Sequence, residues 1–297
     1  MPGSILVLWP ADPGIDTTTQ IADARGAAPE REPTRVLVAG GAESRTVADV
    51  RLDNPHELRA QLVLATSSSD EQILDAAFAR WGLRFPEHLA GDFAWARWDP
   101  GARELVLVRD HMGIRPLLYA RYRDGFVAST DIRSVRTLPG VDVRWDELYA
   151  AMSFTDIWLN RESTFHVGIR RLTPGSIARV RDAGRTLKVH GYWQLPTADL
   201  QLSTEADHLE RFRDLFLEAV RCRLPSDGCV VTELSGGLDS TVVTAAVASL
   251  MPGGPLLALA ASFAEDRTST AGTTKGATDR GRATIPGSTC SRSRPAA

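Results

Sequence analysis

Leu234-Ser235-Gly236-Gly237-Leu238-Asp239-Ser240 stands between two apolar stretches of the chain. The stretch before it, Cys229 to Leu234, predicts a strand, and the stretch after it predicts a helix from about Ser240 to Leu250. Glycines let the backbone approach a phosphate closely, and the first turn of a helix directs unpaired N–H groups and a positive dipole at it. The sequence therefore predicts a phosphate-binding loop.

The side chains of this loop differ in what they offer an anion. Ser235 and Ser240 add hydroxyl donors, whereas Asp239 would repel a bare phosphate, so we expect it to brace the loop or to contact magnesium. No lysine follows Gly236 and Gly237, which excludes a Walker A motif. The competing interpretation is a tight strand-to-helix turn that a serine or an aspartate caps. The complete motif between a strand and a helix favours phosphate binding.

A second apolar strand, Leu256 to Phe263, follows the predicted helix. Strand, helix and strand in one unit predict a parallel sheet that is buried on both faces. Ahead of this unit, Thr204 to Arg223 predicts one amphipathic helix. Its apolar face consists of Leu209, Phe212, Leu215, Phe216, Ala219 and Val220.

The first half of the chain has the pattern of short strands and turns that is typical of packed antiparallel sheets. Ser69 or Asp70 can cap a helix whose apolar residues recur at helical spacing, and Gly82 ends it. Two hairpins follow, turning at Pro100-Gly101 and at Asp124-Gly125. The expected strands are Ile5–Trp9, Val36–Ala39, Thr46–Val50, Phe93–Asp99, Glu104–Arg109, Leu117–Tyr122, Phe126–Ser129, Ser176–Val180 and Leu187–His190.

The change of pattern divides the chain into three segments, residues 1–198, 199–265 and 266–297, with the first boundary near Pro196 to Leu202. The last segment is dominated by Ser, Thr, Arg and Gly and has too little apolar surface to offset the entropy of ordering. It is a linker or disordered tail, or the frame-shifted end of a longer gene. We favour the frameshift, because a sheet that stops after two strands cannot close a stable core.

Composition excludes several classes of protein. The chain of 297 residues has 43% hydrophobic and 24% charged residues, as soluble globular proteins do, and its net charge of −3 gives no sign of nucleic-acid or membrane binding. Three cysteines are too few for a disulfide framework, and the histidines form no metal-ligand pair. The N-terminus lacks the features of a signal peptide. We therefore expect a cytoplasmic protein, and composition says nothing of its oligomeric state.

The loop resembles the ATP-pyrophosphatase loop of the asparagine synthetase family. That family cleaves ATP between the α and β phosphates, forms an acyl-adenylate and lets an amine attack it. The resemblance implies that Leu234, Ser235, Gly236, Gly237, Asp239 and Ser240 hold the pyrophosphate end of ATP, with Mg²⁺ near Asp239. It also implies an asparagine synthase (glutamine-hydrolysing) type of ligase, whose partners are ATP and a carboxylate, which could belong to a peptide.

Upstream signatures agree with this family. Gly91 to Asp99 is similar to a hairpin of its glutaminase domain, and Arg109 to Leu117 is similar to its R-D-x-x-G-x-x-P-L signature. Ser129 to Ile132, Thr164 to Gly175 and Tyr192-Trp193 fit as well. The resemblance implies an α+β unit followed by an α/β unit. The first is an Ntn-type αββα sandwich of the class II glutamine amidotransferase kind, and the second begins a parallel-sheet PP-loop ATPase domain, which is HUP-like.

Two departures concern the glutaminase half. The family's nucleophile is an N-terminal cysteine, but this chain has Pro2, and no cysteine precedes Cys222, so no catalytic residue is assigned. The family's N-G-E-I-Y-N stretch aligns with Asp49 to Asn54, where Asp49 would repel an oxyanion and Arg51 reverses the charge that should receive the glutamine amine. Asp70 matches a family carboxylate of the glutamine site, but taken alone it is better interpreted as a helix cap. We expect no glutaminase activity.

Three hypotheses for function remain. The first is an amide ligase, either an asparagine synthetase or a member of the lasso-peptide macrolactam cyclase branch, which uses a peptide's own amine. The second is a truncated, non-catalytic remnant, because nothing in residues 266–297 resembles the family's later substrate-binding residues. The third is an interaction module in which the degenerate glutaminase half binds a partner.

Overall fold

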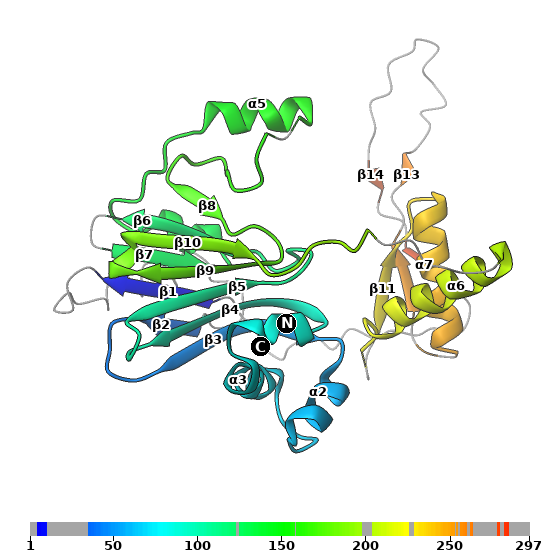
Figure 1. Cartoon of the computed structure of the whole chain (residues 1–297). Helices are drawn as coiled ribbons and strands as arrows, with labels where there is room; N and C mark the ends of the chain where they lie inside the picture. The colour runs from blue at the N-terminus through cyan, green and yellow to red at the C-terminus, as the bar shows by residue number, and fades with distance from the viewer. Residues whose placement is uncertain are drawn as a thin grey trace, which may run out of the picture. The chain divides into compact units, whose positions relative to one another are not determined.

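A computed structural model describes residues 5–10, 35–122, 125–157, 159–197, 204–225, 229–252, 254 and 256–259, and the backbone of three short strands beyond them. The chain divides into two compact units, Met1–Thr197 and Ala198–Ala297. Figure 1 follows the chain through both units. Each unit is described by itself below.

Two five-stranded sheets form the first unit. The first sheet has the order β2-β1-β7-β6-β8 and the second has the order β10-β9-β5-β4-β3. Neighbouring strands are antiparallel except β1 and β2, which are parallel. The first sheet comprises β1 Ile5–Pro10, β2 Arg35–Val38, β6 Leu118–Tyr122, β7 Gly125–Ser129 and β8 Ile169–Arg171; the second comprises β3 Arg45–Leu52, β4 Gly91–Asp99, β5 Glu104–Arg109, β9 Ser176–Arg181 and β10 Thr186–Gly191.

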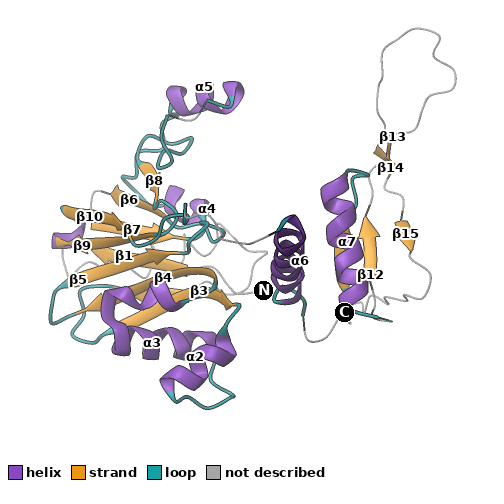
Figure 2. Cartoon of the chain, turned by 45° about the vertical axis from the view of Figure 1, so that its right-hand side comes forward, coloured by secondary structure: helices purple, strands orange, loops and turns teal. Residues whose placement is uncertain are grey.

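Helices cover both outer faces of this pair of sheets (Figure 2). A central core lies between the sheets, where Val7 and Phe126 of one meet Ala96 and Leu107 of the other. A second core packs the outer face of the β3–β4–β5 sheet against α2 Pro55–Leu62, α3 Asp70–Trp81 and the 3-10 helix η1 Gly82–His88. A third core packs the other sheet against α4 Ile132–Arg136. The first unit is therefore the four-layer αββα sandwich that the sequence predicted.

Helix α3 shows how the local sequence sets these elements. Ser69 is its N-cap and accepts from the Gln72 N–H, while the Gln72 side chain accepts from the Ser69 N–H, so both halves of a capping box are present. Ile73, Leu74 and Ala77 lie on one helical face and are buried against the sheet. The prediction of this helix is confirmed, with Ser69 rather than Asp70 as its cap.

Two further elements complete the first unit. α5 Glu147–Thr155 begins at the N-cap Asp146, whose carboxylate accepts from the Tyr149 N–H. η2 Asp182–Gly184 is a short 3-10 turn between β9 and β10. In Figures 1 and 2, α5 lies away from the two sheets, at the end of an arm that leaves and rejoins the sandwich.

The second unit begins with α6 Glu205–Arg221, and β11 Val230–Glu233, α7 Leu238–Leu250 and β12 Leu256–Leu259 follow. β11 and β12 are parallel, with Val230 opposite Leu256 and Glu233 opposite Leu259. The predicted strand–helix–strand unit with a parallel sheet is therefore confirmed. The predicted helix before it is also confirmed, but none of its residues is buried, and Leu209 and Phe212 of its apolar face are exposed.

The end of the chain differs from expectation in two ways. The predicted strand from Leu256 to Phe263 is interrupted, and β13 Ser262–Phe263 pairs instead with β14 Thr278–Asp279. The prediction that the sheet stops after two strands is also wrong, because β15 Arg282–Thr284 pairs with the free edge of β12 and uses backbone groups that two strands leave open. The rest of residues 266–297 lies outside the described residues.

Within the described part of the chain, the helices are too short or too polar to span a lipid bilayer.

Candidate functional site

The predicted phosphate loop connects β11 to α7. Leu234 continues the sheet, because its N–H donates to the carbonyl of Leu259 at 2.7 Å. Gly236 then adopts φ +83°, a left-handed conformation that favours glycine. Gly237 is the N-cap of α7 with extended backbone, and no side chain caps this helix end. The loop therefore leads directly into the N-terminus of α7, which no side chain caps.

Two serine hydroxyls hold this loop in shape. The Ser235 and Ser240 hydroxyl oxygens lie 3.1 Å apart, and the Ser240 hydroxyl oxygen accepts from the Ser235 N–H at 3.2 Å. The Ser240 hydroxyl also lies 3.3 Å from the Gly237 carbonyl, to which the Thr241 hydroxyl donates at 2.8 Å. The hydroxyls that the sequence assigned to an anion are therefore also the groups that link the two ends of the loop.

The loop is open to solvent and rich in donors. Ser235 to Asp239 are all exposed, and a Cβ placed on Gly236 would meet no atom within 4 Å. The first N–H groups of α7, which belong to Leu238, Asp239 and Ser240, have no acceptor within the helix. An anion at this end would meet unpaired N–H groups, the positive end of the helix dipole and two hydroxyls.

Asp239 lies in the first turn of α7 and is exposed. Its carboxylate makes no hydrogen bond or ion pair with the part of the chain that the structure describes, so bracing of the loop falls to the serines instead. Among the described residues there is also no group of three or more His, Cys, Asp or Glu side chains able to hold a metal. A magnesium ion here would depend on ligand phosphates together with Asp239, which is how proteins commonly bind Mg²⁺.

In the first unit, the R-D-x-x-G signature is a buried turn after β5. The Arg109 guanidinium donates to the carbonyls of Gly113, Arg115 and Leu172 at 2.6 to 2.8 Å. The Asp110 carboxylate accepts from the N–H groups of Ile114 and Arg115, both at 2.8 Å. At Gly113, with φ +68°, a Cβ would lie 3.0 Å from the Arg109 guanidinium. The signature residues therefore build a turn rather than a reactive group.

The Ser129-Thr130 signature anchors the beginning of the chain's first strand. The Ser129 hydroxyl donates to the carbonyl of Ile5 at 2.7 Å, and the Thr130 hydroxyl oxygen accepts from the Ile5 N–H at 3.0 Å. All three residues are buried or nearly so. The signature thus fixes where the N-terminal segment enters the sandwich. Pro2 itself lies outside the described residues.

The stretch that aligns with the family's glutamine-binding residues, Asp49 to Asn54, begins on β3. Its charged side chains form ion pairs. Asp49 is buried, and its carboxylate lies 3.3 Å from Nε of Arg115. The Arg51 guanidinium lies 2.6 Å from the Asp53 carboxylate and 3.5 Å from that of Asp92, its cross-strand neighbour on β4. The unfavourable charges that the sequence pointed to are thus neutralised by groups of the protein itself.

Asp70 belongs to the same region. Its carboxylate accepts from the N–H of Leu52 at 2.9 Å, so it ties the first turn of α3 to the end of β3. The interpretation of Asp70 as a helix cap is wrong, because Ser69 supplies the cap. Asp70 holds the Asp49–Asn54 stretch in place.

Two residues of this region were not found from the sequence. Arg115 follows Asp49 by more than sixty positions, and Asp92 lies in the aligned hairpin strand, well after Arg51, so neither is a neighbour of β3 in the chain. Arg115 stands at an unspecified position of the R-D-x-x-G-x-x-P-L signature. Only the pairing of β3 with β4 and the Asp110 turn bring these side chains to Asp49 and Arg51.

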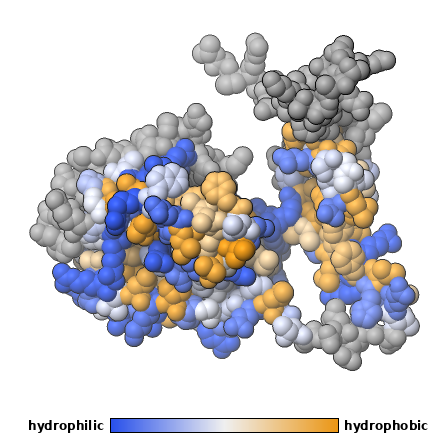
Figure 3. Space-filling model, turned by 90° about the horizontal axis from the view of Figure 1, so that it is seen from above, coloured by the Kyte–Doolittle hydropathy of each residue, from blue (hydrophilic) through white to orange (hydrophobic). Residues whose placement is uncertain are grey.

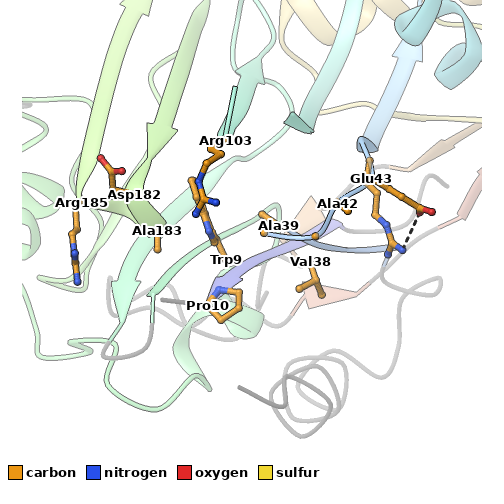
Figure 4. A pocket seen from close by; sticks show the side chains of 13 residues that line it. Trp9, Pro10, Val38, Ala39, Ala42, Glu43, Arg103, Asp182, Ala183 and Arg185 are labelled. Atoms are coloured by element: carbon orange, nitrogen blue, oxygen red, sulfur yellow. Dashed lines mark ion pairs between the residues drawn. The ribbon is translucent and has the colours of Figure 1, made fainter. Parts of the chain in front are cut away.

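The first unit also has a cavity of about 880 Å³ near the ends of β1, β2 and β9. Figure 4 shows Trp9, Arg103 and Asp182 at its wall, with Glu43 paired to Arg45 at 3.7 Å on one side. None of the described residues that line it belongs to the predicted site. The cavity is therefore separate from the Asp49–Asn54 stretch.

Comparison with known families divides the chain in the same way. Residues 48–193 match the glutamine amidotransferase domain family, and residues 211–282 match the asparagine synthase family. The first match contains the β3 ion pairs and the Asp110 turn, and the second contains the phosphate loop.

The relatives of this chain include proteins named as amidases and proteins named as asparagine synthetases. The chain is 34% identical to amidase chry2 of Gibberella zeae over 64% of this chain and 28% of the relative. It is 29% identical to asparagine synthetase [glutamine-hydrolyzing] 3 of Bacillus subtilis over 65% of this chain and 31% of the relative. The chain thus matches about a third of the length of these proteins.

Among solved structures, the chain is similar to the glutamine phosphoribosylpyrophosphate amidotransferase from B. subtilis. The identity is 16% and the TM-score 0.38, over 79% of this chain and 50% of that chain.

Proposed function

Because this chain belongs to the asparagine synthetase family, we propose that its second unit binds the pyrophosphate end of ATP during the activation of a carboxylate for amide-bond formation. The observation that supports this most is the exposed loop from Ser235 to Ser240 at the uncapped N-terminus of α7. In this reaction a carboxylate oxygen attacks the α-phosphorus of ATP, and pyrophosphate leaves. An amine then attacks the acyl-adenylate and releases AMP.

The conformations of Gly236 and Gly237 favour a phosphate-binding loop over a simple turn. Gly236 needs glycine for its backbone conformation, but Gly237 has φ −79° and a Cβ there would meet only Ser235 Oγ, at an ordinary 3.5 Å. Serine or asparagine at Gly237 would cap α7 better than glycine does. A phosphate that approaches the backbone at this point gives a reason for glycine that the fold alone does not.

The residues present fit ATP with Mg²⁺ in a specific division of roles. We assign the N–H groups of the first turn of α7, with the Ser235 and Ser240 hydroxyls, to the β- and γ-phosphate oxygens. Asp239 is the one carboxylate of the motif, and we assign it to the magnesium ion that the phosphates carry. Leu234, at the end of β11, positions the loop at the sheet edge.

The glutaminase half is proposed to be inactive. Glutamine's α-amine and the oxyanion of its amide would need free groups of the right charge. Asp49 and Arg51 of β3 are instead paired with charged side chains outside this strand. The nitrogen would then come from an amine that the substrate or another protein supplies. A lasso-peptide type of macrolactam cyclase, with a peptide's own N-terminal amine, is the finer proposal that this arrangement favours over asparagine synthesis.

The test is isotope exchange between ATP and pyrophosphate in the full chain, with aspartate and with a peptide that carries both a free amine and a side-chain carboxylate. Exchange that depends on either carboxylate supports an activating enzyme and identifies the class of substrate. Titration calorimetry with MgATP in the same buffer separates the alternatives. If the folded chain binds no ATP, a non-catalytic remnant or a partner-binding module replaces this proposal, and glutamate release from glutamine would refute the inactive glutaminase half.

A further inference from the structure

The cavity of about 880 Å³ in the first unit is built by turns that are far apart in the sequence. Trp9 lies near the end of β1, and Arg103 closes the turn between β4 and β5. Asp182 and Arg185 lie in the turn between β9 and β10, and the loop from Gly40 to Glu43 leads from β2 toward β3. Figure 4 shows side chains from these turns around the cavity. Its volume is within the range of sites that take small organic molecules, about 300–1,000 Å³.

Trp9 presents an unused hydrogen-bond donor to this cavity. The residue is 5% exposed, and its ring packs against that of Trp98 with 4.8 Å between the centroids. The Trp98 indole N–H donates to the Gly41 carbonyl at 2.8 Å, whereas the Trp9 indole N–H makes no hydrogen bond within the described part of the chain. A Cβ on Gly40 would lie 3.8 Å from the Trp9 nitrogen, so the N–H edge of the ring faces the loop in the cavity wall. A buried donor normally has a partner, and a ligand in the cavity can supply it.

Two arginines at this cavity lack an acidic partner. The guanidinium groups of Arg103 and Arg185 make no hydrogen bond or ion pair with any residue that the structure describes. Asp182 lies close before Arg185 in the chain, but its carboxylate accepts from the Thr186 hydroxyl at 3.1 Å instead. Hydrophilic residues are spread over much of the face that Figure 3 shows, so exposure alone does not mark an anion site. The missing partners and the shared cavity are what distinguish these two arginines.

The backbone of these turns is held in a conformation that favours glycine. Arg103 has φ +48°, and Asp182 and Ala183 in the other turn have φ +53° and +51°. Of the five non-glycine residues with left-handed backbone among those described, three therefore line this one cavity. Such positions cost stability for a residue with a Cβ, and they cluster at ligand sites. Arginine at position 103 keeps a charged side chain where glycine would suit the turn better.

We propose that this cavity binds the phosphate group of a small organic molecule. Arg103 and Arg185 contact the phosphate oxygens, because guanidinium groups pair well with phosphate. The Trp9 indole N–H donates to an oxygen of the same ligand. Val38 and Ala183 form an apolar part of the wall, against which the organic part of the ligand packs.

The charges at the cavity favour a phosphate over a single carboxylate. A phosphate monoester carries about 1.5 to 2 negative charges near neutral pH and has three strong acceptor oxygens, which matches two guanidinium groups that no carboxylate pairs. Glu43, at the same cavity, lies 3.7 Å from Arg45 and is neutralised there. The site shares no residue with the loop from Ser235 to Ser240, so it is independent of the ATP site proposed for the second unit.

Titration calorimetry of the full chain with ribose 5-phosphate, inorganic phosphate and succinate tests this. We expect Arg103→Gln and Arg185→Gln each to raise the dissociation constant for ribose 5-phosphate at least tenfold, about the loss expected for a hydrogen bond to a charged group. Arg136→Gln, an exposed arginine of α4 outside the cavity, is the matched control and should bind like the native chain. All three side chains are exposed, so the variants should fold, which circular dichroism verifies.

The three probes separate the possible ligands. Tighter binding of ribose 5-phosphate than of either other probe supports the proposal. Inorganic phosphate bound as tightly would keep the phosphate site but overturn the organic ligand. A native chain that binds neither phosphate probe, or that binds succinate as tightly as ribose 5-phosphate, overturns the proposal, and so does native affinity in both cavity variants.

Chemical modification of arginine locates the ligand independently. Phenylglyoxal reacts with accessible arginines, and ribose 5-phosphate should slow its reaction with Arg103 and Arg185 but not with Arg136, as peptide mass spectrometry measures. If the chain binds ribose 5-phosphate but Arg103 and Arg185 react at the same rate with and without it, the ligand lies on another surface and the proposal is wrong.

Discussion

The Ser235 and Ser240 hydroxyl oxygens lie 3.1 Å apart and join the entrance of the phosphate loop to the first turn of α7. The Ser235 hydroxyl also lies 3.4 Å from the N–H of Gly237, so a single side chain touches both the loop backbone and the helix. Ser235 is exposed and Ser240 is half-buried. The hydroxyls that hold the loop in shape are therefore the same ones that we propose for phosphate binding.

Replacing either serine tests this double role. Ser235→Ala and Ser240→Ala should each weaken binding of pyrophosphate and MgATP by about fivefold to tenfold, because each removes a hydrogen bond to the ligand and the hydrogen bonds that the hydroxyl makes within the loop. Calorimetry measures the change. Ser249→Ala, which removes a hydroxyl at the far end of α7, is the matched control and should bind like the native chain. Unchanged affinity in all three variants would separate the loop from the ligand.

The two glycines of the loop should respond differently to alanine. Gly236→Ala forces a left-handed conformation on a residue with a Cβ, which costs about 1–2 kcal/mol, so the free energy of unfolding of the second unit should fall. Gly237→Ala meets no such strain, so it should lose less stability, about 0.5 kcal/mol, because alanine caps a helix less well than glycine, while it loses ATP affinity. Chemical denaturation and calorimetry on the same pair of variants make the comparison. If Gly237→Ala binds ATP normally, the backbone there does not approach a phosphate.

Asp70 should contribute to stability through strand β3. Asp70→Ala removes the acceptor of the Leu52 N–H, and we expect the free energy of unfolding to fall by about 1–2 kcal/mol. Asp75→Ala, on the exposed face of the same helix, is the control and should change it by less than about 0.5 kcal/mol. Urea denaturation followed by tryptophan fluorescence reports both. Equal effects would mean that the bond to Leu52 does not hold the strand.

The surroundings of His111 predict how the stability of the first unit responds to acid. Its ring lies among Phe93, Tyr192 and Trp193, and burial lowers its pKa below the ordinary 6.5, against the opposing charge of Asp110. A histidine whose pKa is lower in the folded state takes up its proton more readily when unfolded. Above pH 6.5 the ring is neutral in both states, so its protonation does not affect folding. As the pH falls below 6.5, the unfolded state binds the proton more readily, and the free energy of unfolding decreases.

Denaturation at a series of pH values between 5 and 8 measures this dependence. His111→Phe keeps a ring but cannot titrate, so the difference in free energy of unfolding between the variant and the native chain should shift in favour of the variant as the pH falls below 6.5. His56→Phe, at an exposed position of α2, is the control for replacing a histidine by phenylalanine. A pH-independent difference for His111→Phe would show that the ring's protonation is not linked to folding.

Much of the fold follows from local patterns. The capping box at Ser69 and Gln72, the alternation in Phe93 to Asp99 and the apolar run from Cys229 to Leu234 are each set by residues a few positions apart, and each element formed as predicted. The elements that differed are those whose pairing is non-local. β13 pairs with β14 rather than extending β12, and β15 joins the edge of β12 from more than twenty residues away.

The sequence by itself determined the glycine turn between β11 and α7, because a turn between a strand and a helix needs only neighbouring residues to form. Through the family resemblance it also predicted that the charges of Asp49 and Arg51 are unfavourable for a glutamine site. Only the tertiary structure decided what becomes of those charges. β4 and the Asp110 turn bring Asp92 and Arg115 to β3, and buried or half-buried charges of opposite sign pair because isolation from water would otherwise be costly.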